Sequence, residues 1–395
     1  MNQPLSPSRW RVPIGPLLAA ACAVAWTGAL AGPLRAEVIV LANRTQEEIA
    51  FRVTHLDDTV QDFRIAATDV MPLPVSGPVS LEYQADGARR GFELDPDQIY
   101  FFYEHETLGV SVQQIGIGEG TGQLRPPPRV DMGPQPLPDD RLGIITVKLC
   151  VDEEERANRE TWTRRLVTRL KAASDIFEKH CRIRFQPIAT GTWRSSNHIN
   201  QFEASYDEFQ KQKSPEPADL CIGFSSQYRR PAGPTMLGAT RGAFHPWIFI
   251  REWPQQVSEP ERLEVLVHEL GHYLGAAHIP EPDSVMRARL GDRQSLSRKF
   301  LIKFDPINTL IMYRVAEEVR FRDVRRMNQL TPAAKLRIYC IYHDLARAQP
   351  NDTSARVHMA QMGNPTANIP VPPRPQPSVN TRRAPATGAA GGAGN

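Results

Sequence analysis

The sequence predicts a multidomain α/β (α+β) protein, in which a small β-sandwich precedes a larger domain of strands joined by a long helix. Apolar and polar residues alternate with a period of two over the first part of the chain. Further along, apolar residues recur at helical spacing between two strand-like runs, and a segment rich in Pro and Gly lies between the two parts. We divide the 395 residues into an export signal, a β-sandwich-like domain, a linker, a larger domain and a tail, at 1–36, 37–117, 118–140, 141–347 and 348–395.

The N-terminal segment has the pattern of an export signal. Two arginines precede an apolar stretch from Val12 to Leu30, and small-residue cleavage motifs follow at Ala29-Leu30-Ala31 and Leu34-Arg35-Ala36. We expect a secreted, periplasmic or cell-surface protein; a retained anchor and a lipidated Cys22 are the alternatives. No later stretch is long and apolar enough to span a bilayer, so no stable membrane span is expected after cleavage.

Residues 37–117 are predicted to form roughly seven short strands. The clearest alternation is in two apolar sets, Ile49, Phe51, Val53 and Val79, Leu81, Tyr83. Pro and Gly residues separate the runs. The linker at 118–140 is Pro-rich and is expected to be extended. The tail from 348 is rich in Pro, Ala, Gly and Asn and is expected to be disordered.

The larger domain is predicted to contain a βαβ crossover. A strand at 144–149 is followed by an amphipathic helix whose apolar stripe is Trp162, Leu166, Leu170, Ala173 and Phe177. Further strands are predicted at 182–188, 218–224 and 244–250. Strand, long helix and strand in this order favour parallel pairing. A last helix is expected from Thr331-Pro332 to about residue 346.

Residues 268–278 carry the strongest chemical signal. His268 and His272 are four residues apart, so on a helix both imidazoles lie on one face and can bind one metal ion. Glu269 lies beside that face, where it can act as a general base. Gly275 is expected to end the helix, because glycine adopts the left-handed conformation at low cost. The chain can then return with His278 as a third ligand, which leaves one position for water, as in catalytic zinc sites.

The helix that carries this motif has a clear predicted start. Ser258 is a good N-cap residue, and Glu261 lies three residues later, which is the spacing of a capping box. Pro260 falls in the first turn, where a missing N–H costs little. Leu263, Leu266, Leu270 and Leu274 provide an apolar stripe for the core.

The pattern HExxHxxGxxH followed by a methionine resembles the metzincin zinc metalloproteases, and its spacing resembles the matrixin branch. The resemblance implies a twisted, mostly parallel sheet, a long backing helix and an active-site helix, here with an N-terminal β domain. It implies that Met286 forms the Met-turn beneath the metal, with Met312 as the alternative. It also implies that an edge strand within 237–250 pairs with an extended substrate.

The sequence departs from matrixins in two respects. Matrixins hold a second, structural zinc ion with several upstream histidines, whereas this region offers only His245. We therefore expect one catalytic Zn²⁺ and no structural zinc. Residues 37–149 contain no Cys, so a cysteine-switch propeptide has no counterpart here.

These observations predict an exported zinc-dependent endopeptidase. Zn²⁺ is expected on His268, His272 and His278, and Glu269 is expected to activate water for attack on a peptide bond. One alternative is a gluzincin-like zinc peptidase whose third ligand is a downstream acid, Glu317 or Glu318. Another is a cell-surface binding or adhesion protein with a catalytically weak zinc domain.

The expected partner is a protein or peptide substrate. The net charge is only +3, and no basic run interleaves with aromatic residues, so nucleic-acid binding is not expected. Oligomeric state has no signal in the sequence. Outside the signal, four cysteines remain, an even number that predicts disulfides with three possible pairings, buried thiols being the alternative. They are Cys150, Cys181, Cys221 and Cys340.

Overall fold

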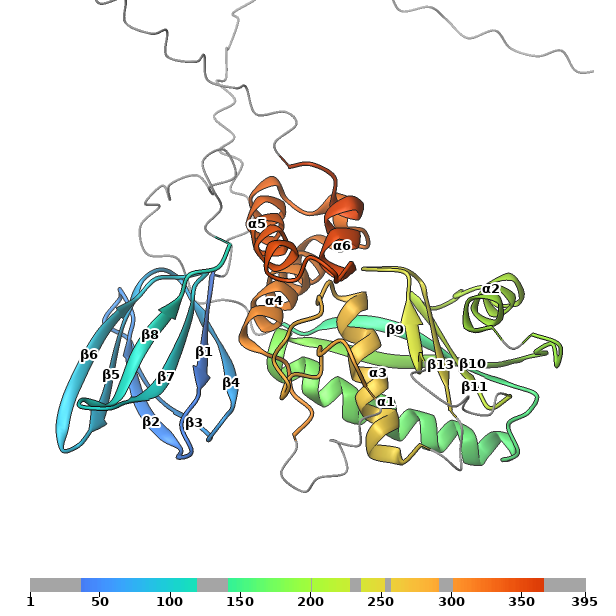
Figure 1. Ribbon diagram of the computed structural model, residues 1–395, viewed down its shortest axis with the longest axis horizontal. Coiled ribbons are helices and arrows are strands. Elements are labelled where there is room, and N and C mark those ends of the chain that lie inside the picture. The colour runs from blue at the N-terminus through green and yellow to red at the C-terminus, as the bar shows by residue number, and fades with distance from the viewer. Residues whose placement is uncertain are drawn as a thin grey trace, which may run out of the picture.

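The structure is a computed structural model that describes residues 37–118, 141–199, 201–227, 236–252, 257–290 and 301–365. The predicted export signal, nearly all of the predicted linker and the end of the predicted tail lie outside these residues. In the described part, a two-sheet β unit lies beside a larger α/β unit (Figure 1). No helix of that part is both long and apolar enough to cross a membrane.

The β unit consists of two four-stranded sheets, with strand orders β4-β1-β7-β8 and β3-β2-β5-β6. Alternating apolar residues of both sheets fill the space between them, as the period-two pattern predicts; Phe51, Leu81 and Phe102 are examples. The strands are β1 (Glu37–Asn43), β2 (Ile49–Thr54), β3 (Val60–Ile65), β4 (Val70–Val75), β5 (Val79–Ala85), β6 (Ala88–Leu94), β7 (Ile99–His105) and β8 (Gly109–Ile115).

The larger unit is built on a five-stranded sheet of order β10-β9-β11-β13-β12. All neighbours are parallel except β12, which runs antiparallel to β13 at one edge. The strands are β9 (Gly143–Asp152), β10 (Ile183–Trp193), β11 (Leu220–Ser225), β12 (Gly238–Thr240) and β13 (Trp247–Arg251). The edge expected within 237–250 is therefore only β12, since β13 lies inside the sheet.

Helices cover both faces of this sheet. Helix α1 (Arg159–Cys181) connects β9 to β10, and the whole predicted apolar stripe is buried. Together with α3 (Glu259–Tyr273) it packs on one face, while α2 (Phe202–Gln212) packs on the other. The remaining helices are α4 (Pro306–Arg322), a 3-10 turn at Met327–Gln329, α5 (Pro332–Ala348) and α6 (Ser354–Met362).

Helix α4 joins the two units (Figure 1). It is buried on nearly all sides. The apolar cluster that contains its buried side chains also includes residues of β1, such as Val38 and Val40. The neighbouring Ile39 and Leu41 point into the sandwich instead, so β1 is buried on both faces. The two units therefore share an apolar cluster around α4, while the interior of the sandwich forms a cluster of its own.

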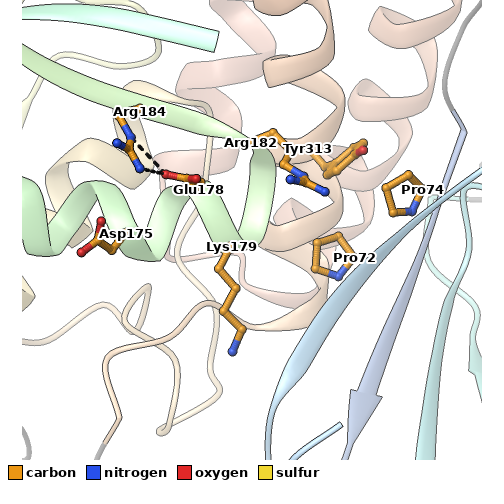
Figure 2. A pocket seen from close by; sticks show the side chains of 8 residues that line it. All are labelled: Pro72, Pro74, Asp175, Glu178, Lys179, Arg182, Arg184 and Tyr313. Atoms are coloured by element: carbon orange, nitrogen blue, oxygen red, sulfur yellow. Dashed lines mark hydrogen bonds and ion pairs between the residues drawn. The ribbon is translucent and has the colours of Figure 1, made fainter. Parts of the chain in front are cut away.

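Polar contacts add to this shared cluster. The buried guanidinium of Arg314 on α4 pairs with Asp97 of the β unit and with Glu317 one turn along. Beside the contact lies a polar cavity of about 500 Å³, between Pro72 and Pro74 of β4 and the end of α1 with Lys179 and Arg182 (Figure 2).

Replacing Asp97 by Asn is expected to lower the free energy of unfolding by roughly 1.5–3 kcal/mol, the usual worth of a hydrogen bond to a charged group. The substitution removes a carboxylate that, together with Glu317, offsets the buried charge of Arg314. Asn tolerates the positive φ of 62° at this position. Urea denaturation of the full chain measures the effect. Asp58→Asn is the matched control, because Asp58 has the same φ but is exposed; equal losses in both variants would contradict the role of the ion pair.

The expected tail begins later than residue 348. Residues 354–362 form α6, in which Ala355, His358 and Met362 are buried against the larger unit. The composition of the whole segment hid this helix, because the Pro- and Gly-rich part lies mostly beyond it.

No disulfide joins Cys150, Cys181, Cys221 and Cys340 in the described residues, contrary to the prediction. All four are buried, which is the usual environment of a cysteine that acts as a small apolar side chain. The sulfurs of Cys150 and Cys221, on the neighbouring strands β9 and β11, are 3.6 Å apart.

Candidate active site

The helix α3 begins and ends where the sequence predicts. Ser258 is its N-cap and forms both halves of a capping box with Glu261, and Pro260 lies in the first turn. Gly275 follows the last turn with φ of +88°, a conformation that other residues adopt only with strain. A Cβ there would also lie 2.8 Å from the hydroxyl of Tyr342.

The three predicted histidines come together at one point. The Nε2 atom of His272 lies 3.1 Å from the Nε2 atoms of both His268 and His278, and those two atoms are 3.4 Å apart. In a tetrahedral zinc site with Zn–N distances of about 2.0–2.1 Å, ligand nitrogens are about 3.3–3.4 Å apart. The three rings therefore fit one Zn²⁺ and leave a fourth position open.

The second nitrogen of each ring has a hydrogen-bond acceptor. The Nδ1 atoms of His268 and His272 lie 2.8 Å from the carbonyl oxygens of Val285 and Ala276. The Nδ1 atom of His278 lies 2.7 Å from a carboxylate oxygen of Asp352. These acceptors require the proton on Nδ1, so each Nε2 presents a lone pair to the common point.

Burial favours the ligating form of these side chains. It lowers the pKa of His268 to about 3 and holds the pKa of His272 well below its ordinary value. Both imidazoles are therefore neutral near pH 7, which is the form that binds a metal ion.

Glu269 lies beside the histidines and beneath the edge strand. Burial raises the pKa of its carboxyl to about 8, although the backbone amide of Thr240 opposes this rise. A Cβ on Gly238 would lie 2.8 Å from the Glu269 side chain, so β12 passes directly over it. A cation on the histidines would favour the carboxylate form.

Of the two predicted Met-turn residues, Met286 lies at the histidine helix and Met312 lies within α4. Met286 is fully buried, and a Cβ on Gly271 would lie 2.7 Å from its sulfur. Gly271, between the two helical histidines, therefore allows Met286 to pack against the helix. The preceding residue, Val285, supplies the carbonyl that orients His268.

The loop from Ala276 to His278 is fixed to α4. The side chain of Asn308 accepts a hydrogen bond from the amide of Ala277 at 2.8 Å and donates one to the Ala277 carbonyl at 2.9 Å. Asn308 in turn contacts Asp305, the N-cap of α4. Sequence analysis did not identify Asn308, because a single amide 31 residues away has no local signature.

Glu317 and Glu318, the acids considered as an alternative third ligand, are not grouped with the histidines. Glu317 pairs with Arg314 at the contact with the β unit, and Glu318 bonds to Thr331. In the described residues, the side chains grouped for metal binding are the three histidines. His245 hydrogen-bonds to Gln210 of α2.

A cleft of about 910 Å³ opens at the site. It is lined by β12 with the adjoining Met236 and Leu237, by residues 288–290 and by residues of the segment 351–358. The three histidines and Glu269 also line it. An extended chain can lie along β12, because an edge strand offers backbone hydrogen-bonding groups.

No protein-family model and no curated protein matches the chain. Among solved structures, an archaemetzincin from Methanopyrus kandleri is similar at 16% identity and a TM-score of 0.33, over 45% of this chain and 96% of that one. A chain of a chaperone–substrate complex is similar at 10% identity and a TM-score of 0.33, over 72% of this chain and 42% of that one. A zinc-dependent peptidase from Methanocorpusculum labreanum is similar at 12% identity and a TM-score of 0.29, over 42% of this chain and 99% of that one. Likenesses this weak place the chain in no family.

Proposed function

We propose that the protein is a zinc-dependent endopeptidase of the metzincin type. The observation that supports this best is the convergence of three Nε2 atoms within 3.1–3.4 Å of one another, each ring being oriented through Nδ1. Glu269 supplies the second requirement, a carboxyl group that lines the same cleft as the histidines. The matrixin-like assignment, with Met286 as the Met-turn, belongs to this proposal and rests on the spacing of the motif.

The chain's own residues divide the chemistry between them. Zn²⁺ bound by the histidines would polarise the scissile carbonyl and lower the pKa of water at the open position. Glu269 accepts the proton of the attacking water and passes it to the leaving amine. The edge strand β12 binds the substrate backbone next to Glu269 and thereby orients the bond to be cut.

The proposal includes export. It rests on the pattern of the first 36 residues, two arginines followed by an apolar stretch and small residues. An exported peptidase acts outside the cytoplasm, and its substrates are proteins or peptides.

Cleavage of denatured casein by the purified full chain, with and without a chelator, tests the activity. We expect cleavage that stops when the chelator removes zinc and returns when Zn²⁺ is added back, because the three histidines can bind the ion again. Gel electrophoresis and metal analysis of the same samples provide the measurement. Zinc-loaded protein that leaves casein and a peptide library intact would contradict the proposal.

A further inference from the structure

Three residues that follow α5 hold His278 in place. The Gln349 side chain donates a hydrogen bond to the His278 carbonyl at 3.0 Å, and the Ser354 hydroxyl accepts one from the His278 amide at 2.9 Å. Asp352 accepts a hydrogen bond from Nδ1 of His278 at 2.7 Å. The backbone and the ring of this one residue are thus bound from the same segment.

Asp352 is itself fixed. One carboxylate oxygen accepts hydrogen bonds from the amide and the hydroxyl of Ser354, at 2.9 and 2.5 Å. The other oxygen is the one that faces His278. The carboxylate therefore cannot turn away from the ring without giving up its bonds to Ser354.

The same segment continues as α6 and reaches two more parts of the cleft. Nε2 of His358 lies 3.0 Å from the carbonyl oxygen of Ala276, the same oxygen that orients His272. The Gln361 side chain bonds the backbone of Arg241 and Ala243, just after β12. Residues 349–362 thus contact the loop of the third histidine and the end of the edge strand.

We propose that residues 349–362, which we call the C-terminal clamp, are part of the metal site and that Asp352 is the positioning residue for His278. This inference rests on the proposed zinc site. A carboxylate that accepts a hydrogen bond from Nδ1–H fixes the ring orientation and raises the basicity of Nε2. The neutral carbonyls bonded to His268 and His272 orient those rings without supplying a charge. Asp352 therefore strengthens one ligand of the three.

The test uses the full chain with Asp352→Ala and Asp352→Asn, and it measures zinc affinity by competition with a chelating dye. Loss of such a partner typically weakens metal binding by about 10–100-fold, and we expect Asp352→Ala to fall in this range. Asp352→Asn is expected to lose less zinc affinity, because the amide oxygen can still accept the hydrogen bond from Nδ1–H of His278 but carries no charge. The zinc-induced rise in melting temperature should shrink in the same order.

A purely structural role predicts a different result. It would lower the melting temperature of the metal-free protein and leave zinc affinity unchanged, and this outcome would overturn the inference. Asp175→Ala is the matched control, because Asp175 is an exposed residue of α1 whose carboxylate forms an ion pair with Lys171 on the same helix. If the parent protein binds zinc but cuts no peptide, the proposed peptidase fails while the role of Asp352 is still decided by the affinities.

Discussion

Replacing Glu269 by Gln is expected to leave zinc bound and to lower peptide hydrolysis by at least about 100-fold, the lower end of what general acid–base catalysis contributes. Gln has the same shape but cannot take a proton from the attacking water. The three histidines and their Nδ1 partners are untouched. Metal analysis and casein cleavage on the same preparation measure both parts of the expectation.

The fold is expected to tolerate this change. Burial raises the pKa of Glu269 to about 8 in the metal-free protein, so at pH 7 the folded state holds mainly the neutral acid. A neutral amide of equal size therefore adds no charge to the buried site. The matched control is Glu160→Gln, at an α1 residue whose side chain is 87% exposed. Full activity of Glu269→Gln would rule out the general base, whereas loss of zinc would show that the variant disturbs the ligands.

The parts of the fold with a local signature were predictable. The stripe from Trp162 to Phe177 identified α1, and the capping box at Ser258 located the first turn of α3. The spacing of His268, His272 and His278 predicted that the three rings meet, because helix geometry places the first two on one face. The structure brings all three together.

Helix α4 shows why the rest was not predictable. Its residues are buried on nearly every side, so apolar and polar residues do not separate into two faces, and no helical period is visible. The charged residues that interrupt the apolar ones include Arg314, Glu317 and Glu318, each of which is paired inside the protein. Met312 consequently looked like a turn residue but lies in the middle of this helix.

The supporting residues of the site were missed for another reason. Asp352 is 74 residues from His278, and Asn308 is 31 residues from Ala277. Contacts at such separations leave no pattern in a single sequence. The low-complexity end of the chain further hid α6, so the expected tail included residues that line the cleft.

Replacing His278 by Ala is expected to weaken zinc binding by more than the roughly 10–100-fold typical of a lost supporting residue, since a ligand itself is removed. Two imidazoles at His268 and His272 would remain, one fewer than the three protein ligands of a catalytic site. Activity should fall with zinc occupancy and recover in part at high zinc concentration. Chelator competition and casein cleavage across a zinc titration measure both.

The same variant separates the proposed site from its closest rival. In a site whose third ligand were Glu317 or Glu318, His278→Ala would cost little affinity. The structure argues against that arrangement, because Glu317 already offsets the buried charge of Arg314 at the contact with the β unit. His198→Ala, at an exposed loop histidine, is the matched control. Equal zinc affinities of the two variants would remove His278 from the ligand set and would leave Asp352 without the metal-site role that we assign to it.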